Sequence, residues 1–160
     1  MYILIIIAII LYILGYVVKY IKSNKTSTIN ENCYTAKTNP MTDTEKIFLS
    51  YLKPFTDKYN FIILPQVQLQ SIFKISNNKD IANFNKIKSK SVDFAIVDNK
   101  YNYKIFIELD DYTHNQKNRI ERDIFVNNLF NTYNLKLKRI KVQNNYNLEQ
   151  IESIIKEVVN

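Results

Sequence analysis

The sequence predicts an α/β domain that follows an apolar N-terminal helix. Apolar residues recur at helical spacing in three stretches, and short apolar or alternating segments typical of strands lie between them. The resulting order is helix, strand, a variable segment, two strands, helix, strand and helix. The chain has 160 residues, which is enough for one domain of ordinary size and an appendage.

The N-terminal segment is a run without charge over residues 2–18. At 1.5 Å per residue this run reaches roughly 25 Å, just short of the ~30 Å hydrocarbon core of a bilayer, and Tyr20 and Ile21 extend it. We therefore expect a transmembrane anchor at residues 1–22, with membrane contact through residues 2–21.

Two other interpretations of this run fit it less well. A cleaved signal peptide needs basic residues before the run and small residues at a cleavage site, and a core helix needs a polar stripe. The lysines that follow the run, Lys19, Lys22 and Lys25, predict a single-pass protein with its C-terminal domain in the cytoplasm. Residues 23–41 are polar and lack periodicity, which predicts a flexible linker before a domain at residues 42–160.

The domain is expected to begin with a helix at Thr42. Glu45 follows Thr42 by three residues, the spacing of a capping box, and apolar residues follow at helical spacing. Residues 60–64 predict a buried strand that ends near Pro65. Residues 67–90 predict irregular helix and loop.

The second half of the domain has a more regular pattern. Residues 91–97 alternate, residues 98–100 predict a turn, and residues 103–109 predict the second strand of a hairpin. Residues 115–133 predict a long helix and residues 136–142 a fourth strand. Apolar residues from 148 to 158 line a final amphipathic helix.

Composition excludes several classes of site. Cys33 is the only cysteine and His114 the only histidine, so an intrachain disulfide and a tetrahedral Cys/His zinc site are both excluded. Gly15 is the only glycine, which excludes glycine-rich phosphate loops. The net charge of +7 permits a nucleic-acid partner without requiring one.

Three carboxylates fall on the two strands of the predicted hairpin. Glu108 and Asp110 point to the same side of their strand, and Asp93 on the neighbouring strand could join them. Converging carboxylates need a cation, and oxygen ligands suit Mg²⁺ or Mn²⁺. Acidic residues are also ordinary at strand ends and turns. Glu108, however, follows the apolar residues 105–107, where an unpaired carboxylate is costly.

A family resemblance adds to this pattern. The segments TDTEKIFLSYLKP, FIILPQVQL, SVDFAIVDNKYNYKIFIELDDYTH and KLKRI, with R-x-x-RD after ELDDYTH, resemble an uncharacterised bacterial domain family over residues 42–142. That family belongs to the restriction-endonuclease-like PD-(D/E)XK superfamily and is similar to very-short-patch-repair endonucleases. The resemblance implies a restriction-endonuclease-like core, in which helices flank a mixed four-stranded sheet. It also implies hydrolysis of phosphodiester bonds in DNA or RNA, with DNA favoured.

The resemblance implies a role for each matching residue. Asp93 matches the first metal-binding Asp, and Glu108 matches the acidic residue of the signature. Asp110 stands where the superfamily usually has Lys, although the related E-x-D-G-x-x-H pattern also has Asp there. Glu45 matches a position that sometimes helps bind metal, and Gln66 a polar strand position near the site.

Two further residues have both a functional and an ordinary interpretation. His114 could orient water or bind a phosphate, or it could be a helix-start residue bonded to backbone. Arg122 could reach a phosphate or the acidic cluster, or it could lie on a solvated, ion-paired helix face.

Basic residues complete the predicted nucleic-acid contacts. Lys86, Lys88 and Lys90 form a basic loop, and Lys138 and Arg139 belong to a basic strand. A charged edge strand that prevents aggregation explains the second group equally well. The sequence thus predicts a membrane-anchored nuclease that uses Mg²⁺ or Mn²⁺. The alternative is a catalytically inactive tethered module that binds nucleic acid or a protein.

Overall fold

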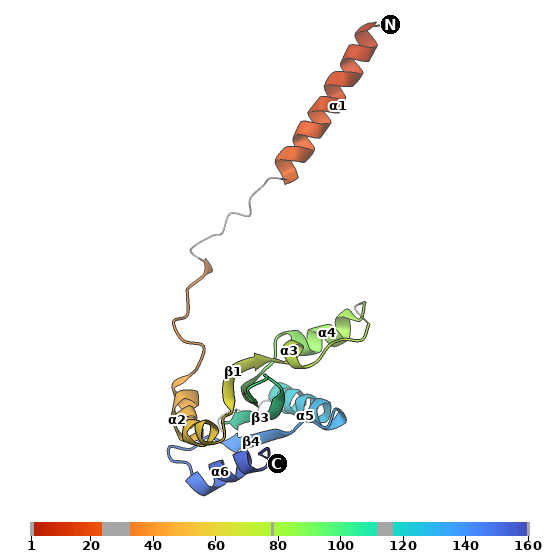
Figure 1. Ribbon diagram of the computed structural model, residues 1–160. Coiled ribbons are helices and arrows are strands. Elements are labelled where there is room, and N and C mark those ends of the chain that lie inside the picture. The colour runs from red at the N-terminus through yellow and green to blue at the C-terminus, as the bar shows by residue number, and fades with distance from the viewer. Residues whose placement is uncertain (1, 24–32, 78, 112–116, 160) are drawn as a thin grey trace. The chain divides into compact units, whose positions relative to one another are not determined.

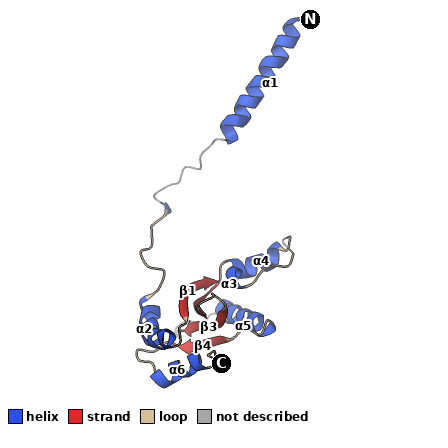
Figure 2. Ribbon diagram, in the orientation of Figure 1, coloured by secondary structure: helices blue, strands red, loops and turns tan. Residues whose placement is uncertain are grey.

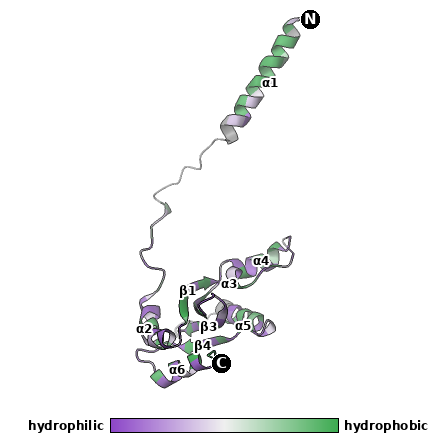
Figure 3. Ribbon diagram, in the orientation of Figure 1, coloured by the Kyte–Doolittle hydropathy of each residue, from purple (hydrophilic) through white to green (hydrophobic). Residues whose placement is uncertain are grey.

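A computed structural model describes residues 2–23, 33–77, 79–111 and 117–159. The chain divides into two compact units, Met1–Lys37 and Thr38–Asn160. In the first unit, helix α1 spans Tyr2–Ser23 (Figure 1). Figure 3 shows its hydrophobic character over most of its length.

The predicted transmembrane anchor is wrong. Among the residues that the structure describes, no helix combines the length and the apolar character needed to cross a membrane. The uncharged run ends at residue 18, and Lys19 and Lys22 fall inside the last turns of α1. A run of this length spans roughly 25 Å, less than the ~30 Å of a bilayer core. The predicted single-pass, cytoplasmic localisation is wrong for the same reason.

The second unit is built on a mixed four-stranded sheet, as expected (Figure 2). The strands are β1 (Ile62–Gln68), β2 (Ser91–Val97), β3 (Tyr103–Asp110) and β4 (Leu137–Lys141), in the order β1-β2-β3-β4. β1–β2 and β2–β3 pair antiparallel, whereas β3–β4 pair parallel. A parallel pair needs a crossover, and α5 (Lys117–Thr132) supplies it.

Helices cover both faces of this sheet. α2 (Asp43–Lys58) and α6 (Leu148–Lys156) pack on one face, where Phe48 and Ile155 join Phe94 and Ile107 in the core. α3 (Leu69–Ile72), α4 (Ile81–Lys88) and α5 contribute to the core of the opposite face. Because both faces of the sheet are covered, residues 94–97 of β2 and 105–109 of β3 are buried without a break. The alternation expected for residues 91–97 therefore does not continue beyond Phe94.

The capping box at Thr42 is present as predicted. The Thr42 hydroxyl accepts a hydrogen bond from Glu45 N at 3.3 Å, and Glu45 Oε2 accepts one from Thr42 N at 2.9 Å. Both bonds satisfy backbone donors that an α-helix leaves unpaired at its start. Glu45 is therefore held at the N-terminus of α2, facing the sheet.

The expected end of the first strand near Pro65 is wrong, because β1 continues to Gln68. β1 is an edge strand that pairs only with β2 in the sheet order. A proline removes one backbone donor, which an edge strand tolerates on its open side. The additional strand residues include Gln66, whose side chain bonds Glu45 at the start of α2.

Candidate functional site

A polar pocket of about 280 Å³ opens beside the C-terminal end of β3. The N-terminus of α2, the start of β2 and the first half of α5 contribute its other walls. It is lined by Thr42, Thr44, Glu45, Asp93, Glu108, Leu109, Asp111, Arg122 and Val142. The pocket thus brings together carboxylates that lie far apart in the sequence.

Glu108 is the most buried carboxylate of this pocket, at 5% exposed. Its Oε1 accepts no hydrogen bond within the described part of the chain, and Arg122 Nη2 lies 3.6 Å away. Burial, followed by the nearby Asp93 charge, raises the pKa of Glu108 to about 7. An unsatisfied buried oxygen of this kind is costly unless a ligand occupies it.

Asp93 is half-buried and is anchored by the neighbouring strand. Its Oδ2 accepts a hydrogen bond from the backbone N–H of Leu109 at 2.7 Å. Burial raises the pKa of Asp93, and the charge of Glu45 adds to this effect, while the Leu109 bond opposes it. The pocket therefore holds carboxyl groups whose charged forms lack full compensation.

Glu45 lines the pocket from α2 and is bonded to Gln66 of β1. Gln66 Nε2 donates to Glu45 Oε1 at 3.0 Å, and Ser91 Oγ donates to Gln66 Oε1 at 3.2 Å. Gln66 has a φ of 52°, a left-handed conformation that is costly for a residue other than glycine. The two hydrogen bonds fix the Gln66 side chain, which in turn orients Glu45.

Asp110 does not join the other carboxylates in lining this pocket. Its Oδ1 pairs with Arg139 Nη1 at 2.8 Å. Arg139 also bonds Asp123 at 3.3 Å and Asn127 at 2.9 Å. No group of three His, Cys, Asp or Glu side chains in the described ranges could hold a metal ion. The metal-binding cluster of Asp93, Glu108 and Asp110 is therefore not supported by this arrangement.

Comparison with known proteins assigns the chain to a family. A family model described as a protein of unknown function (DUF2726) matches residues 37–158. The chain belongs to the DUF2726 family. No curated protein and no solved structure matches it. The DUF2726 description states no activity, so the expected kinship with very-short-patch-repair endonucleases depends on the sequence pattern alone.

The other residues predicted for the site of this DUF2726 protein lie in several places, and only Arg122 of those described below lines the pocket. Arg122 reaches the pocket and also donates to the Ser91 carbonyl at 3.4 Å. Lys86 and Lys88 are exposed on α4, and Lys90 follows that helix. Lys138 pairs with Glu157 at 2.8 Å. His114 lies outside the described residues.

Several residues that line the pocket or support its neighbours were not predicted from the sequence. Thr44 lines the pocket one residue before Glu45, and the Leu109 backbone supports Asp93. Asp123 and Asn127 bind Arg139 from α5. Asp123 had a signal, since it belongs to the R-x-x-RD segment. The Leu109 bond has no sequence signal because any residue supplies a backbone N–H.

Proposed function

We propose that this protein hydrolyses phosphodiester bonds of nucleic acid, with DNA favoured over RNA, and uses Mg²⁺ or Mn²⁺. The observation that carries the proposal is the pocket in which Glu108, with an unbonded buried oxygen, lies beside Asp93 and Glu45. Buried carboxyl groups with raised pKa values are characteristic of functional sites.

The residues present fit a divalent cation that shares its ligands with the substrate. Mg²⁺ is commonly held by one or two carboxylates together with waters and substrate phosphates, rather than by a complete protein cage. Asp93 and Glu108 would hold the ion, which is consistent with a pocket that lacks a three-residue cluster in the described chain. When bound, the cation would polarise a phosphoryl oxygen and lower the pKa of a water.

Arg122 and Gln66 have complementary tasks in this proposal. The Arg122 guanidinium lies at the pocket edge and can pair with a phosphate oxygen, which would release it from Glu108. Gln66 fixes Glu45, so that its carboxylate keeps one orientation when the substrate enters.

The alternative is a module that binds nucleic acid without cleaving it. Asp110 occupies the position where the superfamily usually has Lys, and it is engaged by Arg139 at 2.8 Å. A site without the lysine has one cationic group fewer near the scissile phosphate. This observation favours the alternative and makes an activity assay decisive.

The test compares full-length wild type with Glu108→Gln and Asp93→Asn. Supercoiled DNA, single-stranded DNA and RNA are incubated with Mn²⁺, with Mg²⁺ or with chelator. We expect metal-dependent cleavage that falls at least about a hundredfold in both variants. Glu121→Gln removes an exposed carboxylate of α5 and should leave the rate unchanged.

Two outcomes would overturn the nuclease proposal. Cleavage that survives both Glu108→Gln and Asp93→Asn would show that another site, or another protein, acts. A folded wild type that binds DNA and cleaves none of the substrates would establish the inactive module instead.

A further inference from the structure

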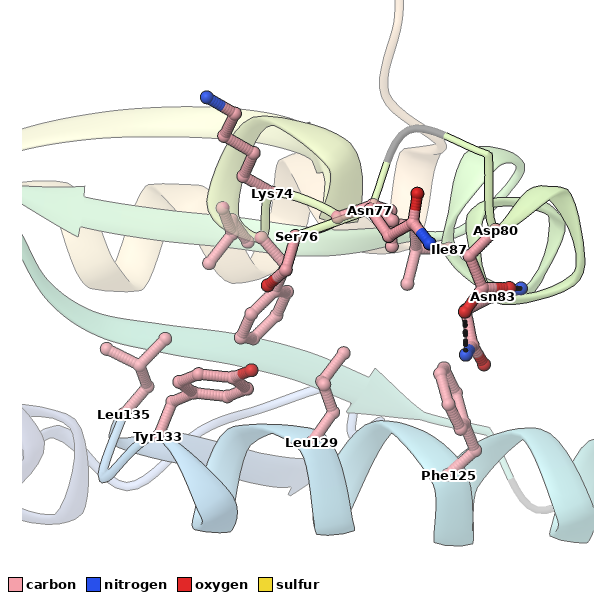
Figure 4. Close-up of a pocket in the computed structure, with 13 residues that line it drawn as sticks. Lys74, Ser76, Asn77, Asp80, Asn83, Ile87, Phe125, Leu129, Tyr133 and Leu135 are labelled. Atoms are coloured by element: carbon pink, nitrogen blue, oxygen red, sulfur yellow. Dashed lines mark hydrogen bonds between the residues drawn. The ribbon is translucent and has the colours of Figure 1, made fainter.

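A second and larger cavity, of about 670 Å³, lies between α5 and the segment that joins α3 to α4. Its volume falls in the roughly 300–1,000 Å³ range of small-molecule sites, so a nucleotide would fit. Figure 4 shows Phe125 and Leu129 of α5, and Tyr133 of the turn directly after it, pointing toward this segment. We call this cavity the α5 groove.

Aromatic rings form much of the wall of the α5 groove. Phe73 comes from the opposite segment, and its ring centroid lies 5.6 Å from that of Tyr133. Tyr133 is 62% exposed, so its ring is available to a ligand. Aromatic faces of this kind stack on nucleobases without regard to sequence.

The rim of the α5 groove is basic. Lys74 lines the cavity, and Lys90 Nζ lies 5.7 Å from the Phe125 ring centroid. Lys86 Nζ donates to Asn83 Oδ1 of the wall at 3.1 Å. The acidic lining residue among those described, Asp80, already accepts two bonds from Asn83. A ligand that matches the aromatic wall and the basic rim has flat aromatic rings and negative charge, as a polynucleotide does.

The α5 groove and the carboxylate pocket are both lined by residues of α5. Arg122 lines the pocket, and Phe125, Leu129 and Tyr133 follow it at spacings of three, seven and eleven residues. Arg122, Phe125 and Leu129 share a face of α5, and Tyr133 lies in the turn directly after this helix. At 1.5 Å per residue, the seven residues from Arg122 to Leu129 extend about 10 Å along the helix. A strand with one phosphate at Arg122 would therefore place its neighbouring bases along the groove.

We propose that the α5 groove binds unpaired bases of a single-stranded nucleic acid, directly beside the phosphate held at the carboxylate pocket. The inference rests on the proposed function and adds the state of its substrate. Bases inside a duplex are stacked on each other and cannot reach Phe125 and Tyr133. The preferred substrate is thus a single strand, an overhang or an unpaired region.

The test measures binding in the presence of chelator, so that cleavage does not contribute. Fluorescence anisotropy of the full-length protein compares a labelled oligothymidylate with an abasic strand of the same length and charge. We expect the wild type to bind the strand with bases at least tenfold more tightly. Tyr133→Ala should weaken that binding about fivefold or more, the loss expected for one base–aromatic stack, and leave abasic binding unchanged.

Two further variants make the result specific. Phe125→Leu keeps an apolar side chain on α5 while removing the π face, and it should also reduce the preference for bases. Tyr101→Ala removes a tyrosine of similar exposure, 66%, in the β2–β3 turn and should have no effect.

The outcomes separate this inference from the proposed function. Equal binding of both strands by a nuclease that cleaves would overturn the groove and leave the nuclease standing. A base preference that disappears in Tyr133→Ala, in a protein that never cleaves, would establish the groove and remove the nuclease. Loss of abasic binding in Tyr133→Ala would also overturn the groove, since phosphate contact would then explain the effect.

Discussion

Arg122 Nη2 lies 3.6 Å from Glu108 Oε1, a buried oxygen that accepts no hydrogen bond within the described part of the chain. The positive charge of Arg122 lowers the pKa of Glu108, against the larger effect of burial. The Arg122 side chain is 34% exposed, whereas the Glu108 side chain is 7% exposed. Arg122 is thus free to meet a ligand at the surface, while Glu108 stays fixed in the sheet.

Substitution of Arg122 should destabilise the protein in a pH-dependent way. At pH 8 Glu108 is largely ionised, so Arg122→Gln removes its compensating charge and should cost on the order of 1 kcal/mol. At pH 5 Glu108 is neutral and the cost should be smaller. Urea unfolding at both pH values checks this, with Arg122→Lys as the variant that keeps the charge. Equal losses at both pH values would show that Arg122 acts through packing alone.

Substitution of Glu108 should stabilise the protein at pH 8, whereas substitution of Arg122 destabilises it. The folded pKa of about 7 lies above the ordinary value of 4.5, so protonated Glu108 is the form that folding favours. This contribution is fully present below pH 4.5 and is lost as the pH rises through about 7. Glu108→Gln does not titrate, and its stability relative to wild type should increase by up to about 3 kcal/mol between pH 4.5 and pH 8.

Free energies of unfolding measured in urea across this pH range test the Glu108 prediction. Glu121→Gln, at an exposed position of α5, serves as the control and should give a flat difference. A flat difference for Glu108→Gln as well would mean that Glu108 ionises normally, which would also weaken its proposed role as a cation ligand.

Arg139 should be a structural residue and not a nucleic-acid contact. It bonds Asp110, Asp123 and Asn127, and thereby joins β3, β4 and α5. Arg139→Met keeps the apolar stem but leaves the two carboxylates without this partner, which should cost roughly 2–3 kcal/mol. The neighbouring Lys138→Met removes a more exposed ion pair with Glu157 and should cost under about 1 kcal/mol.

Thermal and urea unfolding of the two variants compare these costs. If Arg139→Met were as stable as Lys138→Met but bound DNA with a shallower salt dependence, Arg139 would be a phosphate contact after all.

The capping box at Thr42 should contribute measurably to the stability of α2. Thr42→Ala removes the hydroxyl that accepts from Glu45 N at 3.3 Å and should cost about 1 kcal/mol. Thr42→Ser keeps the hydroxyl and should behave like the wild type in urea unfolding. A cost in Ser equal to that in Ala would assign the effect to the lost methyl group.

Local features of this chain were determined by the sequence itself. The capping spacing of Thr42 and Glu45 and the turn at residues 98–100 each depend on neighbours a few residues away. The burial of Glu108 was also foreseeable, because it continues the apolar residues 105–107. Such features follow from backbone periodicity and short-range hydrogen bonds, which a sequence displays directly.

Long-range relationships were decided by the tertiary structure. Asp110 and Glu108 share a strand face. Arg139, which follows Asp110 by 29 residues, bonds Asp110, whereas Glu108 lines the pocket. The passage of β1 through Pro65 depends on its place at the sheet edge. The groove beside Tyr133 depends on residues 72–77 lying opposite α5 across a shared cavity. The strand pattern allowed several partners for each carboxylate, and only the packing of α5 and β4 against β3 selected one of them.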